Sequence, residues 1–197
     1  MKKLKRNFFT KSTLSVSKNL LGKFVVRRYR GKNICGKIVE VESYIGTKDK
    51  ASHAYLGKRT KRNEAEYLIG GHIYIYLVYG MYFQFNISTS KEDIPECVLI
   101  RALEIEEAEK LERKEQKKII KLTNGPGKLC KYLKLNKSFY GDDIINSKKI
   151  WIEDRGVKIK KNNIILSRRV GIDYAGEYWS KIPWRFYIKE NIFVSKA

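Results

Sequence analysis

Cysteine, histidine and proline are scarce in this chain of 197 residues, which contains three, two and three of them respectively. The cysteines are widely spaced and form no CxxC pair, which argues against a disulfide framework and against a zinc site, and favours a reducing cytoplasm. No apolar run approaches the roughly 18 residues of a membrane span, and the basic N-terminus lacks the apolar core of a secretory signal. We therefore expect a cytoplasmic protein with no metal and no membrane partner.

Acidic residues are also few, because 21 Asp and Glu stand against 42 Lys and Arg and give a formal net charge of +21. A polyanion would relieve this self-repulsion, and nucleic acid is the leading candidate because phosphate contacts release condensed counterions. A genome that favours lysine codons is the alternative explanation. With 43% hydrophobic residues the chain is able to bury a core, and its length predicts one domain, 1–197, taken as a monomer by default.

Local patterns predict a mixed α/β (α+β) domain. Caps, periodicity and glycine stops indicate helices over 12–21, 104–122 and 128–133. Alternating apolar residues indicate strands over 23–30, 34–44, 72–78, 82–88, 98–103, 150–152, 164–166 and 184–187. The sequence contains no internal repeat and no linker, which supports a single domain.

The strand 34–44 carries two carboxylates in a strongly basic chain. Alternation would place Val39 and Val41 on one face and the other side chains on the opposite face: Ile38, Glu40, Glu42 and Tyr44. A carboxylate that faces DNA weakens binding by Coulomb repulsion, so it needs a chemical reason to be there. It can deprotonate a water or stabilise a positively charged sugar. The alternative is that both glutamates pair with neighbouring Lys or Arg.

A tyrosine-rich hairpin over 72–88 is the second candidate feature. Tyr79 lies at the predicted turn, and an apolar side chain at a hairpin tip is able to wedge between base pairs from the minor groove. Tyr76 could stack on an extruded base. Alternating Tyr and Ile is also ordinary strand composition, with half-buried rings.

Two loops complete the set of candidates. His53 lies in a basic loop, where it could stack on or hydrogen-bond a base, or could simply be solvated. Gly125-Pro126-Gly127-Lys128 opens a helix and offers N–H groups and a lysine to a DNA phosphate. It lacks the spacing of a nucleotide-binding loop, so it does not indicate ATP. The alternative is that these residues only interrupt the chain and start the helix.

The order of these segments is more specific than any one of them. The chain resembles the alkyladenine (3-methyladenine) DNA glycosylase family in seven segments: IVEVESYIG, ASHA, TKRN, HIYIYLVYGMYFQFNIS, VLIRALE, NGPGKLCKYLKLNKS and SRRVGIDYAGEYWSKIPWRFYI. The resemblance runs from Leu20 to about Tyr187. It implies a curved, mainly antiparallel sheet flanked by helices, with a protruding DNA-intercalating hairpin.

The resemblance also implies an activity and assigns residues to it. A monofunctional glycosylase of this kind flips a damaged purine out of duplex DNA and hydrolyses its N-glycosidic bond without a cofactor. Glu42 matches the glutamate that activates the attacking water, and Arg101 matches the arginine that helps to hold that water. Tyr44, His53 and Tyr76 match the residues that enclose the base, and the backbone N–H of His53 would bind the purine 6-position.

Other positions match residues that select the base or hold the DNA. Asn86 matches the asparagine that crowds the purine 2-position and disfavours unmodified guanine, and Tyr79 matches the intercalating side chain. Lys128 and Lys137 fall in the segment expected to contact phosphates, and the basic loop adds Lys58 and Arg62. Two positions depart from the family pattern. Lys58 stands where an arginine can occur, which could loosen a DNA contact, and Gln84 stands where a cysteine is common.

Two other functions fit the composition. A non-catalytic basic nucleic-acid-binding protein would explain the charge and the tyrosines, but not a carboxylate among them. A bifunctional glycosylase-lyase, which forms a Schiff base through a lysine, is not excluded in a chain with so many lysines. Release of free bases from methylated DNA distinguishes a glycosylase from a non-catalytic binding protein. Borohydride trapping distinguishes a glycosylase-lyase from a monofunctional glycosylase.

Overall fold

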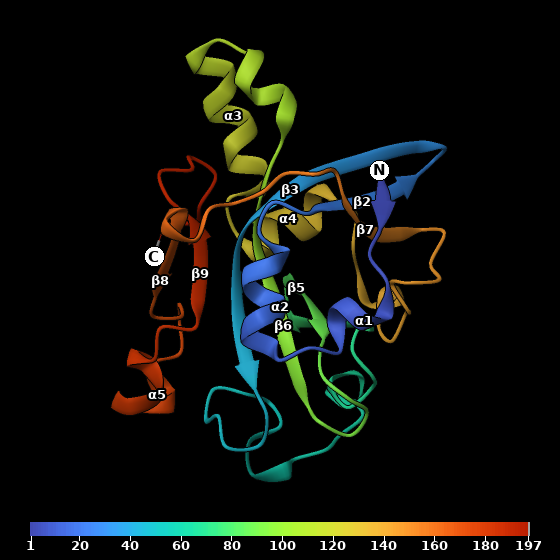
Figure 1. Cartoon of the computed structure of the whole chain (residues 1–197), viewed down its shortest axis with the longest axis vertical. Helices are drawn as coiled ribbons and strands as arrows, with labels where there is room; N and C mark the ends of the chain where they lie inside the picture. The colour runs from blue at the N-terminus through green and yellow to red at the C-terminus, as the bar shows by residue number, and fades with distance from the viewer. Residues whose placement is uncertain (197) are drawn as a thin grey trace.

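An antiparallel sheet organises the chain in the computed structural model, which describes residues 1–196 apart from the side chain of Glu109. The strand order is β1-β7-β2-β3-β6-β5-β4, with β9 paired to β3 and β8 paired to β9 (Figure 1). The nine strands are β1 (Lys2–Lys3), β2 (Phe24–Tyr29), β3 (Lys32–Ile45), β4 (Ile73–Val78), β5 (Tyr82–Ser88), β6 (Glu96–Glu104), β7 (Ile150–Asp154), β8 (Ile164–Ser167) and β9 (Arg185–Ile188).

Short helices lie against this sheet. The α-helices are α1 (Arg6–Phe9), α2 (Thr13–Leu20), α3 (Arg113–Thr123), α4 (Pro126–Tyr132) and α5 (Glu177–Lys181). The 3-10 helices are η1 (Tyr55–Gly57), η2 (Glu64–Glu66), η3 (Glu106–Lys110), η4 (Lys137–Phe139), η5 (Lys161–Asn163) and η6 (Asp173–Ala175). None of the helices within residues 1–196 is both long enough and apolar enough to cross a membrane. The predicted α+β fold class, a mainly antiparallel sheet flanked by helices, is confirmed.

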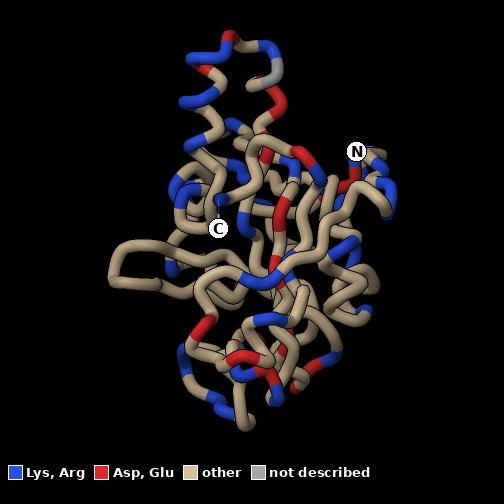
Figure 2. Tube along the Cα trace, turned by 90° about the vertical axis from the view of Figure 1, so that its left-hand side faces the viewer, with Lys and Arg blue, Asp and Glu red and all other residues tan. Residues whose placement is uncertain are grey.

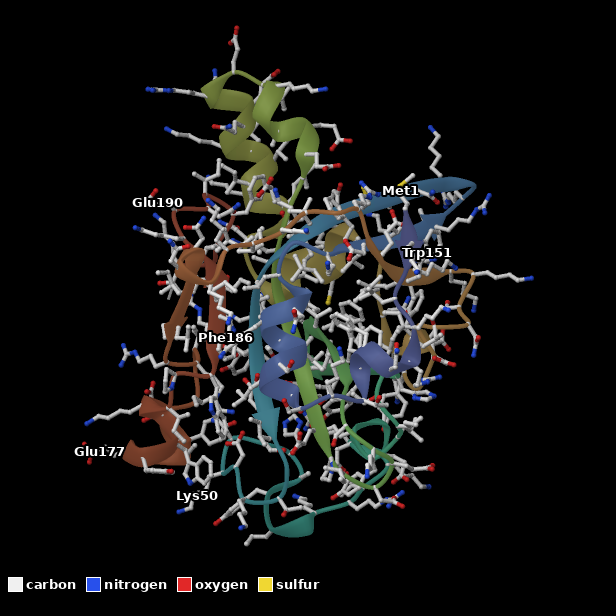
Figure 3. All side chains as sticks on the ribbon, viewed as in Figure 1. Met1, Lys50, Trp151, Glu177, Phe186 and Glu190 are labelled. Atoms are coloured by element: carbon white, nitrogen blue, oxygen red, sulfur yellow. The ribbon has the colours of Figure 1, made fainter. Side chains whose placement is uncertain are left out.

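The main core lies where α2 and α4 cover the sheet. Helix α2 packs on β3 and β6, and α4 packs on β5 and β6. Val16 of α2 and Leu129 of α4 belong to the same buried apolar cluster as the strand residues beneath them. Phe186 of β9, labelled in Figure 3, joins this cluster, and the ammonium of Lys18 lies 5.5 Å from the centre of its ring. Burial of this apolar surface supplies the main driving force for folding.

Strand β3 is shared by both halves of the sheet. It pairs with β2 through residues 32–37, with β6 through 37–45 and with β9 through 40–42. The register with β6 shifts on both sides of Glu40. Consequently Ile38 packs in the same cluster as Val41, and Val39 packs in a separate cluster with Ala102. The alternation predicted from sequence is therefore wrong for Ile38 and Val39, because a bulge interrupts the pleat there.

The predicted helix over 104–122 is also wrong in part. It is divided into η3 and α3, with extended backbone at Leu111 and Glu112 between them. Ala108 and Ile119 both pack in the second apolar cluster. A straight helix would separate these two residues by about 16 Å, so the chain has to turn back. Figure 1 shows the two segments side by side at the top of the molecule.

The hairpin β4–β5 has the predicted turn. Tyr79 and Gly80 have φ of 52° and 70°, and the N–H of Met81 donates to the carbonyl of Val78 at 3.1 Å. Two central residues with positive φ define a type I′ turn, a conformation that suits Gly but strains Tyr. The hairpin is the uncharged loop that projects at the left of Figure 2. The Tyr79 side chain at its tip is 86% exposed.

Candidate active site

Strand pairing aligns residues that are far apart in the sequence. Glu42 of β3 lies opposite Leu99 of β6, Leu99 lies opposite Asn86 of β5, and Asn86 lies opposite Tyr74 of β4. Directly paired residues point to the same face of a sheet. These four side chains therefore form a row across four strands.

A cavity of about 550 Å³ lies over this face. That volume is within the usual range of small-ligand sites. The strands contribute every second residue to its lining, namely Tyr44, Tyr74, Tyr76, Gln84, Asn86, Cys97, Leu99 and Arg101. Its other walls come from loops and include Ala51, His53, Arg62, Glu66, Val170, Gly171, Ile172 and Tyr174. Pro126 and the hairpin residues 77–79 also border it.

Glu42 lies directly behind this lining. Its side chain is fully buried, but its carboxylate contacts three residues that border the cavity. Oε1 accepts a hydrogen bond from the backbone N–H of Val170 at 2.8 Å and lies 3.2 Å from Nη1 of Arg101. Oε2 accepts from the hydroxyl of Tyr44 at 3.0 Å. A carboxylate has about four acceptor sites, so Oε2 keeps the capacity to accept from a water.

The loop that carries Val170 is anchored by Arg169, a residue for which we predicted no role from the sequence. The guanidinium of Arg169 is fully buried and donates to both oxygens of Asp49, at 2.6 and 2.9 Å. It also donates to the carbonyl of Ser43 on β3 and lies 4.8 Å from the ring centre of Tyr44. Bidentate pairs of this kind fix orientation as well as distance. Arg169 thereby holds Val170 against Glu42.

Aromatic rings form much of the cavity wall. His53 and Tyr76 meet edge to face with ring centres 4.7 Å apart, and Nδ1 of His53 lies 2.5 Å from the hydroxyl of Tyr74. Burial, reinforced by the charges of Arg62 and Lys58, lowers the pKa of His53 to about 4. Its imidazole is therefore neutral near pH 7. Burial raises the pKa of Tyr76 well above its ordinary value, so this phenol stays protonated.

Two further hydrogen-bonding groups belong to residues that line the cavity. Within residues 1–196 the backbone N–H of His53 has no hydrogen-bond acceptor. The side-chain amide of Asn86, which is 1% exposed, donates to the carbonyl of Tyr74 at 3.1 Å. This bond fixes the amide beneath the cavity. Burial and the charge of Glu42 raise the pKa of Tyr44, whose hydroxyl is thus kept as a donor to that carboxylate.

Glu40 has a different role from its neighbour Glu42. Its Oε1 accepts from Nε of Arg101 at 2.8 Å, from Nε of Arg185 at 2.7 Å and from the hydroxyl of Ser195 at 2.8 Å. Its Oε2 accepts from the backbone N–H of Ser195. The alternative explanation, in which both glutamates pair with Lys or Arg, is thus confirmed: Glu40 pairs with Arg101 and Arg185, and Glu42 pairs with Arg101. Burial opposes the charge of Arg101, but Glu42 and Glu40 outweigh it and raise the pKa of Arg101.

Removal of Glu40 should destabilise the whole protein. Glu40→Ala would leave Arg101 and Arg185 buried without their shared acceptor, which typically costs about 3–5 kcal/mol. Urea unfolding followed by circular dichroism measures the change. The control is Glu177→Ala, which removes an exposed carboxylate of α5 (Figure 3) that pairs only with Lys181. An unfolding free energy of Glu40→Ala equal to that of the control would show that the network contributes little.

The predicted DNA-contacting residues surround the cavity mouth. Arg62 lines the cavity, with its guanidinium 5.4 Å from the ring centre of Tyr76. It also borders a second hollow together with Lys137 of η4. On the other side, Lys128 of α4 and Tyr79 border a shared hollow, and Nζ of Lys128 donates to Oδ1 of Asn124.

Lys58 is exposed on the basic loop and does not line the cavity, although its charge acts on His53, which does. The structure thus brings together all the sequence-predicted residues except Lys58, with Glu42 one layer behind the lining. Sequence reasoning missed Val170 and Tyr174, although both lie in the segment SRRVGIDY that contributes to the family resemblance. It also missed Glu66, for which no sequence signal existed.

A hollow walled by aromatic rings and bordered by basic groups suits one flat base taken out of a nucleic-acid strand, the substrate geometry of base-flipping enzymes. A sequence model of the methylpurine-DNA glycosylase family matches residues 7–192. The chain therefore belongs to the methylpurine-DNA glycosylase family. It is a DNA glycosylase of DNA repair, and DNA is its substrate.

Bacterial relatives agree over the full length. A protein of Natranaerobius thermophilus, provisionally named 3-methyladenine DNA glycosylase, is 44% identical over 198 residues, with 98% of each chain covered. A protein of Clostridium tetani with the same provisional name is 46% identical over 204 residues, with 98% of this chain and 99% of the relative covered. A third, from Clostridium perfringens, is 44% identical with the same coverage as the second.

Proposed function

We propose that this DNA glycosylase removes alkylated and deaminated purines from duplex DNA and leaves an abasic site. The substrate class comprises 3-methyladenine, 7-methylguanine, hypoxanthine and ethenoadenine. The observation that carries the proposal is a carboxylate, Glu42, held by Tyr44, Arg101 and Val170 at the wall of an aromatic cavity. An acidic side chain so near a DNA-binding face lowers affinity, so its presence needs a chemical role.

Glu42 is the general base of the proposed reaction. A water held by Oε2 attacks C1′ of the flipped nucleotide, its proton passes to the carboxylate, and the N-glycosidic electrons leave with the base. The negative charge of Glu42 also offsets the positive charge that develops on the sugar. Arg101 is a positioning residue, because it fixes Glu42 and Glu40 together. When DNA is bound, its Nη1 also helps to hold the water.

The base is held by rings and by two polar groups. Tyr44, His53 and Tyr76 stack on and enclose the purine, and alkylated purines gain from this because they carry positive charge. The unpaired backbone N–H of His53 donates to the purine 6-position. Asn86, fixed by its bond to Tyr74, crowds the 2-position and so disfavours guanine.

The hairpin and the surrounding basic residues hold the duplex. Tyr79 enters the space that the flipped nucleotide leaves, and Lys58, Arg62, Lys128 and Lys137 contact phosphates. One wedge and one cavity lie on the same chain, so we propose that a monomer acts on the DNA, without a cofactor. Its place of action is the cytoplasm, where a bacterial chromosome lies.

Base release from defined duplexes tests the proposal. The purified protein should release free purines from DNA that contains each of the four lesions, in the presence of EDTA. Borohydride should trap no covalent protein–DNA complex, because the proposed nucleophile is water. Binding of the duplex with no release would favour a non-catalytic binding protein, and a trapped complex would indicate a lyase.

A further inference from the structure

A second buried carboxylate, Glu66, borders the cavity and takes no part in the mechanism above. It is the last residue of η2 and is 2% exposed. Its Oε1 accepts a hydrogen bond from the thiol of Cys97 at 3.4 Å. Its Oε2 is buried and has no hydrogen-bond partner among the residues that the structure describes. An unsatisfied oxygen of this kind is costly to bury and calls for an explanation.

No cation in the described part of the chain neutralises this group. Glu66 makes no ion pair with any Lys or Arg whose side chain is described, unlike Glu40, Glu42 and Asp49. Buried carboxylates are normally paired with a positive charge. The surface open to Glu66 is the cavity itself. The missing positive charge therefore has room to enter with a ligand.

The groups that face Glu66 are acidic or neutral. Cys97 comes from β6, Tyr74 and Tyr76 from β4, Asp49 from the loop after β3, and Tyr67 and Tyr140 lie beside them. Burial raises the pKa of Glu66 to about 7; the polar neighbours Cys97 and Asn63 oppose the shift, and the charge of Asp49 adds to it. Protonated and ionised forms are thus both accessible near neutral pH, and a bound cation would favour the ionised form.

We propose that Glu66 is a specificity-determining residue whose unpaired carboxylate binds the positively charged purine of an alkylated nucleotide. The inference rests on the proposed function and adds to it a residue that separates cationic from neutral lesions. The rings of Tyr74 and Tyr76 line the same cavity as Glu66 and favour a cation further, because their faces are electron-rich.

The two carboxylates act on different parts of the nucleotide. Glu42 contacts Tyr44, Arg101 and Val170, whereas Glu66 contacts Cys97, so the two carboxylates adjoin the cavity through different neighbours. During bond cleavage the positive charge moves from the base to the sugar, toward Glu42. Glu66 therefore stabilises the bound substrate at least as much as the transition state, so its loss should raise KM without lowering kcat.

Glu66→Gln tests this assignment on two lesions. Freshly methylated DNA supplies cationic 3-methyladenine, and a duplex with hypoxanthine supplies a neutral base. Above the pKa of Glu66, the variant should raise KM for 3-methyladenine about tenfold, the usual effect of losing one hydrogen bond to a charged group, and it should not lower kcat. KM for hypoxanthine should stay within about twofold of the parent value.

Two further variants make the result unambiguous. Glu64→Gln changes an exposed glutamate of the same 3-10 helix that pairs with Arg59 outside the cavity, and it should leave both KM values unchanged. Glu66→Met keeps the site filled without polarity and should repeat the selective loss. Equal losses for both lesions, or no loss for 3-methyladenine, would overturn the role of Glu66. Failure of the parent protein to release any purine would instead refute the proposed function itself.

Discussion

Replacing Glu42 with glutamine should lower single-turnover excision of hypoxanthine from duplex DNA by about a hundredfold or more, the usual contribution of a positioned general base. Glutamine keeps the shape of the side chain: its oxygen is still able to accept from the N–H of Val170, and its NH2 group is able to donate to the hydroxyl oxygen of Tyr44. It cannot take a proton from water at neutral pH, and it offers no charge to the developing sugar cation. Hypoxanthine is the suitable lesion because it is neutral and leaves less readily than an alkylated base.

Binding measurements separate chemistry from folding in this experiment. Glu42→Gln should bind the same duplex at least as tightly as the parent protein, since a carboxylate near phosphates has been removed. The matched control is Glu153→Gln on β7, a buried glutamate that pairs with Arg155 far from the lining of the cavity. The control should excise hypoxanthine at the parental rate. A Glu42→Gln rate close to that of the control would remove Glu42 from the mechanism.

Replacing Tyr79 with glycine should weaken base flipping by about tenfold, because stacking of an aromatic side chain on a base is worth about 1–3 kcal/mol. A fluorescent base analogue placed at the lesion reports extrusion directly as a change in emission. The physical reason is the position of Tyr79, which is exposed at the hairpin tip and borders the cavity. Excision should fall in parallel with the fluorescence change.

The same variant should not lose stability. Glycine accepts the positive φ of this turn without strain. The unfolding free energy of Tyr79→Gly should therefore equal the parental value or exceed it by up to about 1 kcal/mol. If the unfolding free energy stays the same or rises while base flipping weakens, the strained Tyr79 serves the function of the protein and not its stability. Unchanged fluorescence would count against the wedge. Tyr82→Ala, at an exposed position on the same hairpin, serves as the comparison.

Much of the fold could be predicted from local patterns. Strand β5 and the turn before it lie at the predicted positions, because alternation, aromatic content and a glycine turn all agree there. The prediction failed where long-range packing decides. The bulge around Glu40 and the break between η3 and α3 both place apolar residues in clusters whose other members come from distant segments. A single-strand or single-helix pattern contains no information about those partners.

In the candidate site, too, some features could be predicted from the sequence and others depend on long-range contacts. Glu42, Tyr44 and Tyr76 were found through the family resemblance, and their strand positions determine which face they share. Glu40 has the same residue type and nearly the same place as Glu42, yet Arg185 and Ser195 from the C-terminal segment make it structural. Only the contacts made by each carboxylate separate the two roles.

The sequence by itself determined the charge, the strands with their alternating tyrosines and the order of motifs that places the chain in its family. Those properties depend on composition and on neighbours in the chain. The tertiary structure decided which carboxylates are neutralised, because pairing requires Arg101, Arg169 and Arg185 to reach across the sheet. It also left Glu66 without a cationic partner among the described residues, beside the cavity, and the electrostatics of a buried group depend on what surrounds it in space.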